Sequence, residues 1–126
     1  MNMELWDLAV KAHGHECAGL ACGFRMGEEL KKIFKPTEKI HAIIPGYNCV
    51  ADGISIVTGV SISNHTMKVD KNYENYVFYA EGDDEGWEFK IHKLQMAEGA
   101  DPVTGILAFA RDMLFDITPC DINVEE

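Results

Sequence analysis

The chain has 126 residues, 47% of them hydrophobic, which is the size of one globular domain, so we expect residues 1–126 to form a single domain. Its formal net charge of −10 argues against a nucleic-acid partner, because phosphate binding needs clustered Lys and Arg, and it also argues against an anionic membrane surface. No apolar run reaches the ~20 residues that cross a bilayer. Acidic residues near the start are unlike a secretory signal, so we expect a cytoplasmic protein with reduced cysteines.

Two helices are predicted in the first third of the chain. Apolar residues recur at helical spacing over residues 4–12 and again over residues 17–34, and Gly14 interrupts the pattern between them. Pro36 follows the second stretch and cannot continue it. We therefore expect two helices joined by a short connection.

The second predicted helix carries a strip of glycines on one face. Gly19, Gly23 and Gly27 recur every fourth residue, which leaves that face without side chains and lets another backbone approach closely. The same spacing occurs in membrane helix dimers, but the charged residues Arg25 and Glu28 favour a packing groove in a water-soluble fold. We expect another element of this chain to pack there.

The middle of the chain predicts mostly strands. Residues 40–44, 67–70 and 76–80 are rich in β-formers, and apolar residues alternate with polar ones from Trp87 to Ile91. Residues 49–59 fit both helix and strand, because helical spacing is combined there with β-branched side chains, and we favour a helix.

The last element is predicted to be a helix. Asp101 is a plausible N-cap, Pro102 suits the first helical position, and apolar spacing continues to Leu114. We expect Pro119 to end the regular structure. Helices at both ends of a strand-rich middle predict an α+β fold, with helices packed against a meandering, mostly antiparallel sheet.

The densest group of metal-ligating side chains lies between the first two helices. His13, His15 and Cys17 occupy alternate positions, so an extended chain would point all three the same way, whereas a helix would keep only His13 and Cys17 on one face. Imidazole nitrogen and thiolate sulfur suit zinc, and they can also bind nickel, iron or copper. We expect zinc. The alternative is a polar connection in which each side chain bonds to backbone or water.

A second candidate segment follows the turn-prone residues 45–48. Cys49 precedes Asp52 by three residues, so on a helix the two would share a face. Cys49 is then a candidate fourth metal ligand, and Asp52 is a candidate to orient a ligating imidazole. The alternative is a buried structural cysteine beside a capping aspartate.

Candidate catalytic residues come from the same two segments. Cys17 or Cys49 could act as a nucleophile activated by a nearby histidine. In a catalytic metal site, Asp52 or His15 would carry the proton. The spacing alone does not choose between a thiol enzyme and a metal site.

Both segments resemble a known family. Residues 13–20, His-Gly-His-Glu-Cys-Ala-Gly-Leu, are similar to the His-Gly-His-x-Cys-Pro-Gly opening of the FmdE family of formylmethanofuran dehydrogenase proteins. Residues 49–54 resemble its Cys-x-x-Asp-Ala motif, and the pair Thr58-Gly59 matches as well. Ala18 stands where the family usually has proline, and the chain resembles the core domain without the C-terminal zinc finger.

The resemblance implies a helix after Cys49, a homodimer, and a cleft where the His and Cys residues of both motifs converge. The first functional hypothesis is a metal-binding protein with a small-molecule cleft, linked to one-carbon or molybdenum/tungsten redox metabolism. The second is an accessory protein that binds a redox-enzyme partner and in which the metal only stabilises the fold. The third is a metal-free Cys/His thiol enzyme. Substrate and reaction do not follow from the sequence.

Overall fold

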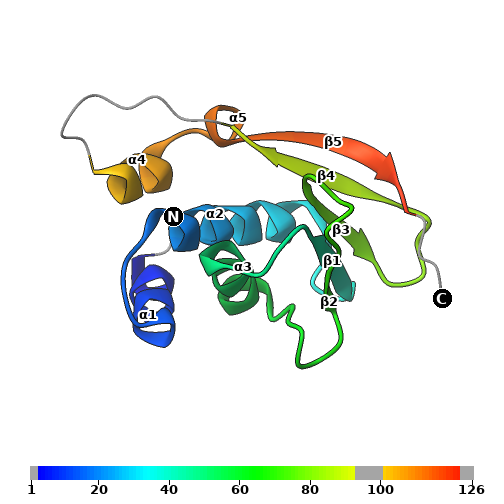
Figure 1. The fold of residues 1–126 in the computed structure, drawn as a ribbon, viewed down its shortest axis with the longest axis horizontal. Helices are drawn as coiled ribbons and strands as arrows, with labels where there is room; N and C mark the ends of the chain where they lie inside the picture. The colour runs from blue at the N-terminus through cyan, green and yellow to red at the C-terminus, as the bar shows by residue number, and fades with distance from the viewer. Residues whose placement is uncertain (1–2, 93–100, 123–126) are drawn as a thin grey trace.

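A computed structural model describes residues 3–92 and 101–122, and in these ranges helices pack on a twisted sheet (Figure 1). The helices are α1 (Met3–His13), α2 (Ala18–Ile33), α3 (Cys49–Thr58), α4 (Pro102–Ala108) and α5 (Arg111–Leu114). The strands are β1 (Ile40–Ile44), β2 (Met67–Val69), β3 (Tyr76–Ala80), β4 (Glu85–Ile91) and β5 (Phe115–Asp121). The predicted α+β class is confirmed.

The sheet has the strand order β2-β1-β3-β4-β5. β1 and β2 are parallel, and the other neighbouring strands are antiparallel, so the expected mostly antiparallel sheet is confirmed. Among the residues described, no helix combines the length and the apolar character needed to cross a bilayer.

The main core lies between the helices and one face of the sheet. Phe24 and Leu30 of α2 and Ile54 of α3 are fully buried there against Phe78 and Phe89 of the sheet. Burying side chains of this size contributes about 1.5–3 kcal/mol each. A smaller cluster covers the opposite face of the sheet, around Ile43, Val77 and Ile122. The helices therefore pack against only one of the two faces of the sheet.

The glycine strip of α2 is the surface that α3 contacts. A Cβ atom placed on Gly23 would lie 2.0 Å from the carbonyl oxygen of Val50, and one on Gly53 would lie 2.5 Å from that of Leu20. One on Gly19 would lie 2.9 Å from Cβ of Cys49. The two helices thus meet backbone to backbone, as the spacing of the glycines predicted.

The C-terminal region differs from the prediction. Asp101 caps α4 by accepting a bond from the amide of Val103 at 3.0 Å, as expected. The helix ends at Ala108, however, and does not continue to Leu114. Arg25 of α2 accounts for the end, because its guanidinium donates to the carbonyl oxygens of Ile106, Leu107 and Phe109. These carbonyls are satisfied by a side chain from another element, so helical continuation is not required.

Strand β5 was missed by the sequence analysis, and Pro119 lies within it instead of ending the regular structure. Phe115 and Ile117 face the helices while Asp116 and Thr118 are exposed, which is the alternation of a half-buried strand. Proline is tolerated because β5 is the last strand of the sheet. In Figure 1, β4 and β5 form a long ribbon that passes over α2.

Candidate metal centre

Three chain segments bring the candidate donor side chains together. His13 is the last residue of α1, Cys17 is the N-cap of α2, Cys49 is the first residue of α3, and His15 lies in the bend between α1 and α2. One ligand atom from each of these four residues lies within 4.8 Å of the others. The helices also bring distant residues into contact, since His13 bonds to Asp52, 39 positions away in the sequence.

The bend at residues 14–16 places the two histidines side by side. Gly14 has φ +101°, a left-handed conformation that ends α1 at little cost only for glycine. Its amide donates to the carbonyl of Val10 at 2.8 Å, which completes the last turn. The rings of His13 and His15 are 4.5 Å apart between centroids. The segment is therefore neither a fully extended strand nor a continuous helix, and all three donors still face one point.

Cys17 is held by the start of α2. Its backbone is extended, and its sulfur accepts the amide hydrogen of Leu20 at 3.4 Å, as an N-cap side chain does. The sulfur also lies 3.7 Å from Nε2 of His13. A metal ion would bind this sulfur in its thiolate form.

Cys49 enters the site because α3 begins beside α2. Asn48 caps α3 by accepting from the amide of Val50 at 2.9 Å, and Gly19 leaves room for Cβ of Cys49. The pKa of the Cys49 thiol is raised, mainly by a hydrogen bond with Cys17 and to a smaller extent by burial. The two sulfurs are therefore neighbours that share a proton-dependent contact.

Asp52 contacts the imidazole of His13, which is the arrangement that the sequence analysis considered for it. Its Oδ2 accepts from Nδ1 of His13 at 2.7 Å, and its Oδ1 accepts from the hydroxyl of Tyr47 at 2.6 Å. With the proton on Nδ1, the Nε2 lone pair of His13 is free to face the sulfur of Cys17. The bond to Asp52 raises the pKa of Tyr47, so this hydroxyl stays a donor.

Tyr47 was missed by the sequence analysis, which treated residues 45–48 only as a turn. A usable signal exists. Tyr47 immediately precedes the N-cap Asn48, and Asp52 is the fourth residue of the helix. These are the two positions whose side chains meet in a hydrophobic staple, so a Tyr–Asp pair there predicts a hydroxyl–carboxylate bond.

The remaining cysteines and histidines lie outside the donor group. Burial, with a smaller contribution from the nearby Cys17, raises the pKa of Cys22, which suits a packing role. Cys120 lies on β5. His92 bonds to Asp116 at 2.8 Å, which raises the pKa of His92. None of these side chains belongs to the donor group.

The four donors fit a tetrahedral transition metal. Zinc bonds of ~2.0 Å to nitrogen and ~2.3 Å to sulfur place neighbouring donors roughly 3.3–3.8 Å apart in a tetrahedron. The Cys17–His13 separation of 3.7 Å already meets this value, and the largest separation in the group, at most 4.8 Å, must contract by only about 1 Å. Two sulfurs and two imidazole nitrogens also match the ligand types that zinc prefers.

The fold and this donor group define a small α+β protein with a His/Cys group that can hold a metal ion. The profile of the family described as "FmdE, Molybdenum formylmethanofuran dehydrogenase operon" matches residues 12–105. The chain therefore belongs to the FmdE family, as the sequence motifs indicated. The match includes both donor segments.

A solved structure with a similar fold is the crystal structure of a tungsten formylmethanofuran dehydrogenase FmdE-like protein from Syntrophus aciditrophicus. The two are 16% identical, the TM-score is 0.72, and the similarity covers 95% of this chain and 72% of that chain. At this identity the likeness shows the fold. A comparison with curated proteins finds no significant match.

Proposed function

We propose that this chain is a metal-binding protein that holds one zinc ion, with nickel or iron as the alternatives, through His13, His15, Cys17 and Cys49. The observation that carries the proposal is the convergence of four soft and borderline donors within 4.8 Å. Membership of the FmdE family supports it. If one coordination position is open to solvent, such an ion can polarise a substrate oxygen or make bound water more acidic.

The residues around the donors suit a site that a small molecule can reach. His15 is the exposed donor, whereas His13, Cys17 and Cys49 are half-buried, so access is from the His15 side. Oδ2 of Asp52 lies 2.7 Å from Nδ1 of His13, where it can accept a hydrogen bond from the imidazole. The family description refers to a formylmethanofuran dehydrogenase operon, which supports a role linked to one-carbon redox metabolism on a molybdenum or tungsten enzyme.

The direct test is metal analysis of the protein purified without an affinity tag. We expect about one equivalent of a transition metal per chain, and anomalous diffraction at its absorption edge should locate the ion among the four donors. Protein that contains no metal as purified, and takes up none from zinc, nickel or iron salts, would refute the proposal.

A metal that only stabilises the fold, in an accessory protein for a redox enzyme, is a second candidate. It is favoured by the presence of four protein donors, because closed four-ligand sites are typical of structural zinc. In that case a chelator should lower the melting temperature sharply. A site with an open position should instead lose ligand binding with a smaller loss of stability.

A metal-free thiol enzyme is a third candidate, and one set of contacts favours it. The sulfur of Cys17, the imidazole of His13 and the carboxylate of Asp52 follow one another at 3.7 Å and 2.7 Å. This is the order of a nucleophile, a base and an orienting group. Rapid alkylation of Cys17 in metal-free protein would favour this candidate, and Cys22 provides the internal comparison.

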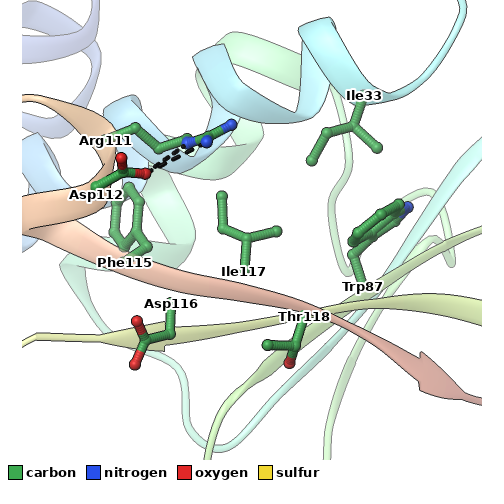
Figure 2. A pocket seen from close by; sticks show the side chains of 8 residues that line it. All are labelled: Ile33, Trp87, Arg111, Asp112, Phe115, Asp116, Ile117 and Thr118. Atoms are coloured by element: carbon green, nitrogen blue, oxygen red, sulfur yellow. Dashed lines mark hydrogen bonds and ion pairs between the residues drawn. The ribbon is translucent and has the colours of Figure 1, made fainter.

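A homodimer in the cytoplasm is the assembly that we propose. An open groove of about 550 Å³ lies between the end of α2 and the β4–β5 ribbon (Figure 2). Its apolar lining includes Ile33, Trp87 and Ile117, which are half-buried, and a second copy of the chain would cover them. The groove is about 24 Å along α2 from Cys17, so dimerisation need not block the donors.

The oligomeric state is testable with a charge placed in this groove. Light scattering of the wild-type protein should give the mass of two chains, and Ile117→Asp should give the mass of one. Val69→Asp is the matched control and should remain dimeric, because Val69 is an exposed apolar residue on β2, at the opposite edge of the sheet and outside the groove lining. A monomeric wild-type protein at micromolar concentration would contradict the proposal.

A further inference from the structure

The loop before α3 is attached to the helix by a polar contact. Tyr47 lies just before the N-cap Asn48, and its hydroxyl donates to Oδ1 of Asp52 at 2.6 Å. In many helices an apolar pair at these positions sets the angle at which the chain enters the helix. Here a charge-assisted hydrogen bond takes that place, and Cys49 lies between the two partners in the sequence.

The same contact determines what Asp52 can do for His13. The Asp52 side chain is 35% exposed, so water competes for its oxygens and the carboxylate could otherwise rotate. Tyr47 occupies Oδ1, which leaves Oδ2 aligned with Nδ1 of His13 at 2.7 Å. The His13 side chain is only 9% exposed, so its ring has few other partners for the Nδ1 proton. Fixing the carboxylate therefore fixes the tautomer of the imidazole.

We propose that Tyr47 is a positioning residue of the metal site, acting through Asp52 to hold His13 with its proton on Nδ1 and its Nε2 facing the metal. This inference rests on the proposed metal-binding function. Among the described residues, Tyr47 makes no hydrogen bond or ring contact with His13, Cys17 or Cys49; its hydroxyl bonds to Asp52. Its effect is transmitted by two successive hydrogen bonds.

The first test needs no metal. Nitrogen NMR of the imidazoles in metal-free protein, at a pH where they are neutral, should show His13 as the Nδ1–H tautomer in the wild type and a shift toward Nε2–H in Tyr47→Phe. Tyr79→Phe is the matched control. Tyr79 packs on the other face of the sheet, stacked on His41, and its loss should leave His13 unchanged. An unaltered His13 spectrum in Tyr47→Phe would overturn the proposal.

The second test measures zinc affinity by competition with a chelator. Tyr47→Phe should bind zinc about 10-fold more weakly, as is typical when a group supporting a metal ligand is removed, with an unchanged melting temperature of the metal-free protein. In the Asp52→Ala background the same change should have no further effect, because the route from Tyr47 to His13 is already broken. A 10-fold loss that persists in that background would show that Tyr47 does not act through Asp52.

The two tests separate this inference from the function it rests on. If the wild-type protein binds no zinc, nickel or iron, the proposed function fails, and the tautomer spectra still decide whether Tyr47 controls His13. If zinc binds normally and Tyr47→Phe changes neither spectrum nor affinity, the proposed function stands and the role of Tyr47 is wrong.

Discussion

Replacing Cys17 and Cys49 together by alanine is expected to abolish stoichiometric metal binding. Each change removes a sulfur ligand, and the loss in affinity should exceed the ~100-fold that changes to supporting groups cause. The remaining donors, His13 and His15, would leave an ion half-coordinated at an exposed bend. Metal content after gel filtration, and competition with a chelator for each single variant, measure the effect.

A cysteine outside the donor group provides the control. Cys120 lies on β5 and is not one of the clustered donors, so Cys120→Ala should keep the full metal content. Retention of one equivalent of metal by the double variant would mean that the ion is held elsewhere. Loss of metal in the Cys120 variant as well would point to an effect on folding.

Gly23→Ala is expected to destabilise the protein by about 3 kcal/mol or more, which is at the upper end for overpacking. The new Cβ would lie 2.0 Å from the carbonyl oxygen of Val50, and this backbone atom cannot move aside without displacing α3. Cys49 is carried on the same helix, so metal affinity should fall together with stability. Urea unfolding of the metal-free protein measures the first effect, and chelator competition measures the second.

Gly46→Ala is the matched control for the glycine prediction. No atom would lie within 4 Å of its new Cβ, so the free energy of unfolding should change by no more than about 0.5 kcal/mol. A Gly23→Ala protein as stable as the Gly46→Ala protein would contradict the close contact between α2 and α3.

Local patterns predicted most of the elements because each one has a clear period and a clear start. The glycine spacing predicted a packing groove, and the structure identifies its occupant as α3. The capping pattern at Asp101 predicted where α4 begins. It could not predict where the helix ends, because Arg25, which satisfies the terminal carbonyls, is 81 residues from Ile106.

Strand β5 illustrates a second limit. The alternation of Phe115, Asp116, Ile117 and Thr118 is the period of a strand, but the preceding apolar residues fit a helix, and Pro119 suggests an end. Only the position of β5 at the edge of the sheet makes proline compatible with pairing. Edge positions are a property of the whole topology, so the local pattern did not reveal them.

For the candidate site, spacing identified the residue types but not how they meet. His13, His15 and Cys17 lie in one short stretch, whereas Cys49 joins them because two helices begin side by side. The contact between Asp52 of α3 and His13 of α1 depends on the same packing of the helices. The role of Tyr47 depends in turn on a rotamer of Asp52, which no periodicity encodes.

Because α2 and α3 are in backbone contact, the two cysteine donors have less freedom to move than His15 when a metal ion binds. Cys17 and Cys49 lie at the start of two helices whose backbones are in close contact, so the backbone positions that carry the two sulfurs can shift little. His15 follows Gly14 in an exposed bend, where small torsional changes are cheap. Ions of different radius would therefore be accommodated by the histidine side of the centre while the sulfur side keeps its dimensions.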